Sequence, residues 1–279
     1  MKIKEETLRW LKSNDLKAKK KYGQNFLIDN DILENISSIP NISEQDTVIE
    51  IGPGLGNLTE KLIAKAKKVI AFEIDEDMIK VLDTRFANTN NLEIVNNDIL
   101  KVDIKDYIRN NEKIKIVANL PYYITTPILF KILEEWSDYT ESMTVMVQKE
   151  VADRMVSKCK SKSYGILTVN IDYYGTATKV FDVPHSAFLP QPNVTSSVVL
   201  IEIEKKHKVI NKEIFFKFVK SAFAKRRKKL INSLESTGFL NLTKEEINKI
   251  LKSNGINENA RAEELNVEEF VKISNYIAN

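Results

Sequence analysis

The sequence predicts an α/β fold, with a mostly parallel sheet, an antiparallel edge and a small all-helical C-terminal domain. Short apolar runs alternate with segments whose apolar residues recur at helical spacing, as in repeated βα units. Glycine-rich or polar residues follow several of these runs, at the strand ends where open parallel sheets bind ligands. Beyond residue 205 no strand candidate remains, and apolar residues recur only at helical spacing.

The predicted elements follow from the spacing of apolar residues. A helix over residues 31–37 is expected to end before Pro40, because proline cannot continue a helix. Two β-rich segments, 166–174 and 196–204, are expected to pair antiparallel at the edge of the sheet. The remaining predicted strands cover residues 47–51, 69–74, 92–95, 113–118 and 143–148, and the predicted helices cover 58–66, 77–86, 127–135 and 149–157. In the C-terminal part, helices are expected around 214–223, 231–234, 245–251 and 267–277.

The composition is that of a globular protein with a sizeable core. Of 279 residues, 43% are hydrophobic and 29% are charged, and no apolar run is long enough to span a bilayer. The first residues are charged throughout, so we expect no secretory signal. The single cysteine excludes an intrachain disulfide, and with two histidines it makes a zinc site unexpected. We therefore expect a cytoplasmic protein without a metal centre.

The net charge of +3 hides two basic zones. Residues 1–27 carry eight Lys and Arg against three acids, and residues 205–231 carry eleven against one. Two such zones on a near-neutral body suggest a polyanionic partner. The alternative is two solvated helix faces, and either zone alone would favour that interpretation.

The most informative stretch is Asn119-Leu120-Pro121-Tyr122-Tyr123, directly after the predicted strand 113–118. Pro121 stiffens the turn, because it fixes its own backbone and restricts Leu120. The turn therefore holds carbonyl groups and an amide side chain at the strand end, with aromatic rings behind them. This combination suits a flat, nitrogen-bearing ring. Taken alone, the stretch favours a proline-broken loop whose tyrosines pack in the core, and the rest of the chain reverses this preference.

A glycine-rich stretch, Glu50–Thr59, joins the first predicted strand of the sheet to its helix. Glycines there allow backbone to approach a ligand closely. Glu73, at the end of the next strand, can accept hydrogen bonds from both hydroxyls of a ribose, and Asp98 follows the third strand. A dinucleotide such as NAD is disfavoured, because Asn57 stands where that motif requires a third glycine. The order of these features favours S-adenosylmethionine (SAM).

With these motifs, the chain resembles the bacterial 16S ribosomal RNA adenine N6,N6-dimethyltransferases nearly from end to end. Asn119–Tyr122 after the fourth strand is typical of amino-nitrogen methylation, and residues 22–27 and 188–196 are specific to the ribosomal RNA group. Further matching segments are residues 50–60, Glu73, Asn97-Asp98, 163–165, 223–234 and 261–265. The resemblance implies a Rossmann-like class I methyltransferase fold.

The resemblance also implies roles for individual residues. Tyr122 and Phe188 would sandwich an extruded adenine, while Asn119 and the carbonyl of Leu120 would accept hydrogen bonds from its amino group, in a turn fixed by Pro121. The proposed SAM-binding residues are Gln24, Asn25, Leu27, Gly52, Gly54, Glu73, Ile74, Asp98, Ile99 and Asn119. The proposed RNA-binding residues are Lys19, Lys20, Lys21, Arg226, Arg227, Lys228 and Lys229.

Three parts are then expected along the chain. Residues 1–30 form a basic lead-in that contributes to the cofactor site, residues 31–206 the catalytic domain, and residues 207–279 a helical RNA-binding domain. The expected substrate is small-subunit rRNA within a partly assembled 30S particle, bound by a monomer during ribosome biogenesis. Three alternatives stay open: a 23S rRNA methyltransferase, a non-catalytic RNA-binding factor on the same fold, and, more distantly, an NAD-dependent dehydrogenase.

Overall fold

The computed structural model describes residues 3–19, 22–109 and 112–279. The described chain divides into two compact units, Met1–Ala152 with Ala177–Ile203, and Asp153–Thr176 with Glu204–Asn279. This division differs from the predicted boundary at residue 207, since residues 153–176 cluster with the C-terminal helices. The expected roles of the parts stay predictions.

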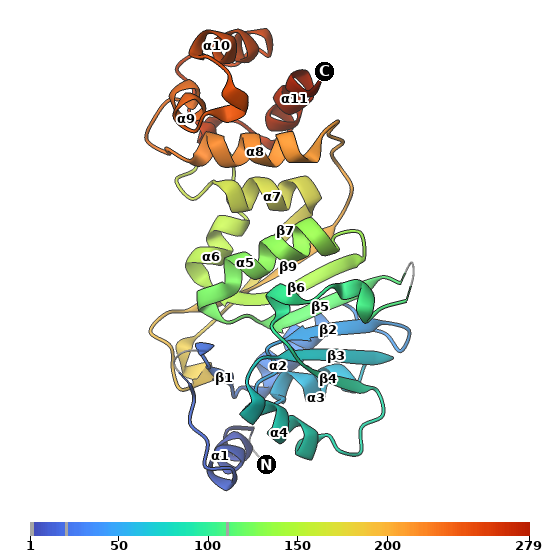
Figure 1. Cartoon of the computed structure of the whole chain (residues 1–279). Helices are drawn as coiled ribbons and strands as arrows, with labels where there is room; N and C mark the ends of the chain where they lie inside the picture. Colours follow the sequence, from blue (N-terminus) through green and yellow to red (C-terminus); the bar gives the residue numbers. More distant parts are fainter. Residues whose placement is uncertain (1–2, 20–21, 110–111) are drawn as a thin grey trace. The chain divides into compact units, whose positions relative to one another are not determined.

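A seven-stranded sheet forms the centre of the first unit, with the order β4-β3-β2-β5-β6-β9-β7 (Figure 1). The pairs that join β4, β3, β2, β5 and β6 are parallel, and β9 runs antiparallel to β6. This confirms the predicted parallel sheet with an antiparallel edge. The strands are β2 (Thr47–Ile51), β3 (Lys68–Glu73), β4 (Leu92–Asn96), β5 (Ile114–Asn119), β6 (Thr140–Gln148), β7 (Gly175–Val183) and β9 (Ser196–Ile203). A separate two-stranded sheet pairs β1 (Phe26–Leu27) with β8 (Phe188–Leu189).

The helices of the first unit follow the strands as the apolar spacing predicts. Strands β2 and β5 are buried over almost their whole length, so their apolar runs continue without alternation. Asp29 and Asp75 cap two of the helices by accepting hydrogen bonds from backbone N–H groups of the first turn. The helices are α1 (Ile3–Ser13), α2 (Asn30–Ser38), α3 (Asn57–Ile63), α4 (Glu76–Arg85), α5 (Thr125–Lys131, continued as a π-helix over Ile132–Trp136) and α6 (Lys149–Met155), the last of which runs into the second unit.

The second unit is helical. An aromatic cluster ties its first helix, α7, to α8: the ring of Tyr173 lies 4.6 Å from that of Phe215, and the ring of Tyr174 stacks on Phe216 at 5.8 Å. The helices are α7 (Ile166–Tyr174), α8 (Lys212–Phe223), α9 (Leu230–Ser236), α10 (Lys244–Ser253) and α11 (Val267–Ala278).

The predicted strand at residues 166–174 is wrong, because these residues form α7. Seven of its nine residues are buried, so the segment shows no polar face and its apolar run resembles a buried strand. The edge strand is the following segment, β7, and β9 lies between β7 and β6. The expected pairing of 166–174 with 196–204 therefore does not occur.

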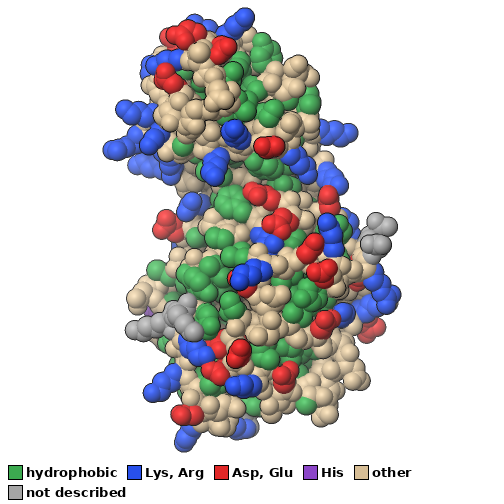
Figure 2. Space-filling view, in the orientation of Figure 1, with side chains coloured by type: hydrophobic (Ala, Val, Ile, Leu, Met, Phe, Trp, Pro, Cys, Tyr) green, Lys and Arg blue, Asp and Glu red, His purple; other side chains and the backbone are tan. Residues whose placement is uncertain are grey.

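The surface carries both signs of charge. Figure 2 shows acidic and basic side chains interspersed over the face in view. No helix formed by the described residues is long and apolar enough to cross a membrane. Within residues 3–19, 22–109 and 112–279, no group of three or more His, Cys, Asp or Glu side chains is placed to hold a metal ion.

Candidate active site

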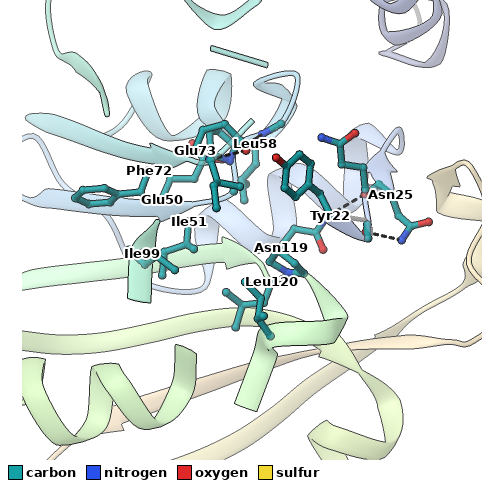
Figure 3. Close-up of a pocket in the computed structure, with 18 of the residues that line it drawn as sticks. Tyr22, Asn25, Glu50, Ile51, Leu58, Phe72, Glu73, Ile99, Asn119 and Leu120 are labelled. Carbon is teal, nitrogen blue, oxygen red and sulfur yellow. Dashed lines mark hydrogen bonds between the residues drawn. The ribbon is translucent and has the colours of Figure 1, made fainter. Parts of the chain in front are cut away.

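One pocket in the first unit lies beyond the carboxyl ends of β2, β3 and β5, where an open α/β sheet binds its ligand. Segments far apart in the sequence meet there, including the turn before β1 and the turns after β2, β4 and β5. Figure 3 shows Glu73, Asn25 and Asn119 arranged around it. Of the predicted site residues, Gln24, Asn25, Leu27, Gly52, Gly54, Glu73, Ile74, Asp98, Ile99, Asn119, Leu120, Pro121 and Tyr122 line this pocket.

The glycine-rich turn after β2 forms one wall of the pocket. Gly52, Gly54 and Gly56 all have positive φ angles, of 67°, 57° and 83°. A Cβ on Gly56 would lie only 2.5 Å from the ring of Phe86, so a side chain there would collide as well as strain the backbone. The φ angles and the contact with Phe86 therefore favour glycine in this turn, and Gly52 and Gly54 line the pocket.

Glu73 is fixed at the end of β3 by backbone amides. One carboxylate oxygen accepts from Gly54 at 3.1 Å, and the other accepts from Ile74 and Asp75 at 2.9 Å each. Burial raises the pKa of Glu73, and these backbone hydrogen bonds oppose that rise by favouring the charged form. The carboxylate thus links two walls of the pocket, the glycine-rich turn and the end of β3.

The other side of the pocket combines apolar and polar groups. Ile74 is 43% exposed and Ile99 is 6% exposed, and both line the pocket. Asp98 caps the short helix that begins at Ile99 by accepting a hydrogen bond from the N–H of Leu100 at 3.0 Å. Two apolar side chains next to a carboxylate can hold a flat ring that carries an amino group at its edge.

The N-terminal segment is docked on the glycine-rich turn through Asn57. Its side-chain nitrogen donates to the hydroxyl of Thr7 at 3.0 Å and to the carbonyl of Leu27 at 2.8 Å. Its oxygen accepts from Arg85 at 2.9 Å, and the same guanidinium donates to the carbonyl of Leu55 at 2.6 Å. Asn57 stands where a dinucleotide-binding motif would carry glycine. Here its side chain holds the N-terminal segment, which supplies Leu27 to the pocket.

A second contact holds the same segment at the start of α4. The Nζ of Lys19 pairs with Asp75 at 2.6 Å and with Asp77 at 2.5 Å, and Gln24 donates to Asp75 at 2.7 Å. These carboxylates raise the pKa of Lys19. Lys19 forms these two ion pairs within the chain, and its predicted contact with RNA stays a prediction; Lys20 and Lys21 lie outside the described residues.

The Asn119–Tyr122 turn is held on both sides. Asn119 donates through its side-chain nitrogen to the carbonyl of Asn25 at 3.2 Å, and the N–H of Leu120 donates to Met146 at 3.1 Å. The hydroxyl of Tyr122 lies 2.6 Å from that of Ser196 on β9. The turn therefore presents the amide oxygen of Asn119 and the ring of Tyr122 from fixed positions.

Phe188 is the predicted catalytic residue that the structure does not bring into the lining of the pocket. It is 1% exposed and pairs with Leu27 through the β1–β8 ladder. Its side chain belongs to the buried core cluster that also contains Leu27. Its contact with the pocket is therefore indirect, through the strand that carries Leu27.

Residues that the sequence analysis did not assign also line the pocket. Tyr123 is 52% exposed, and Tyr22 lies with it at the pocket. Glu50 is 1% exposed, and one of its carboxylate oxygens has no hydrogen-bond partner among the described residues. Burial, together with the nearby Glu73, raises the pKa of Glu50 to about 8. Its position at the end of β2, next to the glycines, was the available signal.

Glu50 makes folding stability depend on pH. Between its ordinary pKa of 4.5 and about 8, the folded chain keeps a proton that the unfolded chain has lost, so stability falls as pH rises through this window. We expect Glu50→Gln to flatten this fall and to stabilise the protein at pH ~8.5 by on the order of a few kcal/mol. Thermal unfolding at several pH values measures this effect, with Glu93→Gln on the surface of β4 as the control. An unchanged pH dependence in Glu50→Gln would contradict it.

The profile of the family described as "Ribosomal RNA adenine dimethylase" matches residues 15–279. The chain is 47% identical over 268 residues to the ribosomal RNA small subunit methyltransferase A of Clostridioides difficile (strain 630), covering 94% of this chain and 92% of the relative. It is 44% identical to the protein of the same name from Listeria innocua, covering 98% and 95%.

Solved structures agree with this result. A dimethyladenosine transferase from Plasmodium falciparum superposes with a TM-score of 0.75 and 28% identity, covering 88% of this chain and 94% of that one. The 23S rRNA methyltransferase ErmE superposes with a TM-score of 0.66 at 23% identity, covering 91% and 100%, which shows a shared fold.

The sheet order, the glycine-rich turn and the pocket at the strand ends define a class I SAM-dependent methyltransferase. Within that class, the chain belongs to the ribosomal RNA adenine dimethylase family. It is therefore an enzyme that uses SAM to methylate adenine in ribosomal RNA.

Proposed function

We propose that this enzyme dimethylates the N6 amino group of two adjacent adenines near the 3′ end of small-subunit rRNA, during biogenesis of the small subunit. Similarity to relatives that carry the small-subunit name, over nearly their whole length, supports the choice of this RNA. The observation that carries the proposal is that Glu73, Asp98 and Asn119 line one pocket, so the groups for the cofactor and for the adenine meet in one place.

The lining of the pocket fits SAM. Glu73, Ile74, Ile99 and Asp98 line the same pocket, which supports a site where the Glu73 carboxylate would accept the ribose hydroxyls and the two isoleucines would provide apolar faces for the adenine ring of the cofactor. Gly52 and Gly54 allow the backbone to approach the methionine part closely. When bound, SAM supplies an electrophilic methyl group on a sulfonium. We propose that Gln24, Asn25 and Leu27 complete the site from the docked N-terminal segment.

The substrate adenine needs an extruded position, because its amino group is out of reach inside a stacked helix. We propose that Asn119 and the carbonyl of Leu120 accept its N–H groups, in a turn fixed by Pro121, and that Tyr122 stacks on the ring. Stacking of this kind contributes ~1–3 kcal/mol, which offsets part of the cost of extrusion.

The reaction needs alignment more than activation. With SAM bound, Asn119 and Leu120 would aim the N6 lone pair at its methyl carbon, so that the nitrogen–carbon bond would form as the carbon–sulfur bond breaks to leave S-adenosylhomocysteine, and the methylated nitrogen would lose a proton to water. Holding the two reactants in line can supply about 7–11 kcal/mol of the barrier reduction. No separate general base is required, because the methylated, positively charged nitrogen is acidic. The second methyl transfer follows the same steps, with one N–H contact fewer.

The remaining assignments are also proposals. Phe188 as a second stacking partner stays a prediction, since it does not line the pocket in this structure. Arg227 and Lys228 are exposed in the helical unit and are proposed to contact RNA phosphates. The expected substrate is a partly assembled 30S particle, and the enzyme is expected to act on it as a monomer in the cytoplasm.

Labelled methyl transfer tests the proposed substrate. Naked small-subunit rRNA, naked large-subunit rRNA and partly assembled small subunits are each incubated with enzyme and labelled SAM, and the product is mapped by mass spectrometry. We expect dimethyladenosine at two adjacent positions near the 3′ end of the small-subunit RNA, with the particle as the best substrate. Methylation of the large-subunit RNA alone would overturn the proposal in favour of a 23S enzyme. RNA binding without any transfer would point to a non-catalytic factor.

A further inference from the structure

The helical unit carries a cluster of basic residues on two loops that are far apart in the sequence. The first loop contains Lys158, Lys160 and Lys162, all exposed, and the small side chains between them are partly buried. The second loop, residues 224–229, contains Lys225, Arg226, Arg227, Lys228 and Lys229, which are also exposed. Neither loop contains an acidic residue.

Arg226 joins the two loops. Its guanidinium donates to the carbonyl of Lys162 at 2.5 Å and to the carbonyl of Tyr164 at 3.3 Å. The planar guanidinium can bind two carbonyls at once, which the single ammonium of a lysine reproduces poorly. Arg226 therefore binds the first loop through one terminal nitrogen, Nη2, which donates both hydrogen bonds, although its position in a basic run suggests a contact with RNA.

A third segment, residues 260–264, contacts the first loop and the residue that directly follows the second loop. The N–H of Lys160 donates to the carbonyl of Glu263 at 2.7 Å, and the N–H of Leu230 donates to the carbonyl of Ala260 at 2.8 Å. The thiol of Cys159 donates to the carbonyl of Glu264 at 3.1 Å. Backbone contacts of this kind hold the loops in place, so their charges are presented together on a preformed surface.

The charges on this surface are mostly uncompensated. Of the eight cations, Lys229 donates to Asn259, and Arg226 binds the two carbonyls. The ion pairs that Lys206, Lys244 and Lys252 form elsewhere in this unit include none of the other six, and the nearby acids are Glu263 and Glu264 in the supporting segment and Glu269, which acts on Cys159. Figure 2 shows Lys and Arg side chains gathered at one side of this unit. Gathered like charges repel one another, so a surface of this kind fits a polyanion.

We infer that the loop 158–162 and residues 225–229 form one RNA-phosphate surface, which Arg226 assembles as a positioning residue. Lys158, Lys160 and Lys162 then contact phosphates, as do Arg227 and Lys228. This inference rests on the proposed function, because it takes the polyanion to be the ribosomal RNA substrate. Phosphate contacts orient the RNA on the enzyme and carry no sequence information.

The first test removes the three positive charges of the loop 158–162. Small-subunit rRNA is bound to the full-length Lys158→Gln/Lys160→Gln/Lys162→Gln variant over a range of salt concentrations. Each lost phosphate contact lowers the slope of log affinity against log salt by about 0.7–0.9, so we expect the slope to fall by about 2–3. The matched control is Lys244→Gln/Lys249→Gln/Lys252→Gln on α10, which removes the same charge from exposed positions of the same unit. An equal effect of both triple variants would overturn the inference, because binding would then follow net charge alone.

The second test separates positioning from contact. Arg226→Lys keeps the charge but loses the paired donors, so we expect it to weaken RNA binding nearly as much as Arg226→Ala does, by about tenfold. Arg227→Lys should bind within about twofold of the wild type, because an exposed phosphate contact needs only the charge. Wild-type affinity in Arg226→Lys would refute the positioning role.

These experiments distinguish a failure of this inference from a failure of the proposed function. If the wild type binds SAM and methylates small-subunit rRNA while the loop variants behave as the control does, only this inference fails. If the wild type binds anionic lipid vesicles and not RNA, both fail. Calorimetry of SAM binding to each variant should give the wild-type affinity, since the pocket is lined by the other unit.

Discussion

Replacing Tyr122 with alanine is expected to lower kcat for methyl transfer by about 100-fold or more while leaving the affinity for SAM within about twofold. In the proposed function the ring stacks on the extruded adenine, so its loss would remove ~1–3 kcal/mol of contact as well as the alignment of the amino group. The cofactor walls at Glu73 and Asp98 do not depend on this side chain. Single-turnover kinetics and calorimetry on the same preparations measure the two quantities.

Tyr122→Phe is the matched control for this prediction. It keeps the ring and removes only the hydrogen bond to Ser196, which lies 2.6 Å away. We expect a loss of only a few-fold in kcat, because the hydrogen bond restrains the ring but the stacking face remains. If Tyr122→Ala weakened SAM binding as much as it slowed turnover, Tyr122 would belong to the cofactor site and its assigned role would be wrong.

Replacing Glu73 with alanine is expected to weaken SAM binding by about 100-fold. The change removes the proposed acceptor for the ribose hydroxyls, and hydrogen bonds to charged groups are worth about 1.5–3 kcal/mol each. It also releases the N–H groups of Gly54, Ile74 and Asp75, which loosens the glycine-rich turn. Titration calorimetry with SAM measures the loss.

Two further variants make the Glu73 result interpretable. Glu73→Gln keeps one acceptor oxygen and the size of the side chain, so its affinity should lie between those of the wild type and Glu73→Ala. Glu93→Gln, on the surface of the neighbouring strand β4, should bind SAM normally. Wild-type affinity in Glu73→Ala would remove the carboxylate from the cofactor site and, with it, the central support for the proposed pocket.

The elements whose structure is decided by a few neighbouring residues were predicted correctly. Strands β2 and β5 are buried and short, and Gly56 requires glycine for both its φ angle and its space, so both features can be read from the chain. The prediction failed at residues 166–174, because a helix buried on most sides has no polar face to reveal its period. Tertiary packing decided that segment.

Apart from Phe188, the cofactor-site and adenine-site residues that belong to sequence motifs were predicted correctly as lining the pocket. Residues whose role depends on contacts with distant parts of the chain were not predicted in this way. Lys19 sits in a basic run, yet two acids that lie more than fifty positions away in the sequence engage it. Arg226 likewise binds carbonyls of a distant loop. Glu50 stands next to the glycines in the sequence, but its burial, which raises its pKa, is not expressed by any spacing of residues. These ion pairs, hydrogen bonds and burial depend on contacts between segments that are far apart in the sequence, and the spacing of residues does not predict such contacts.

The chain passes from one compact unit to the other more than once, since residues 177–203 return to the first unit after 153–176 have joined the second. A fragment that starts at residue 207 would thus lack α7 and would leave the aromatic side of α8, including Phe215 and Phe216, open to water. The helical unit is therefore not a detachable C-terminal segment, because it also contains residues 153–176.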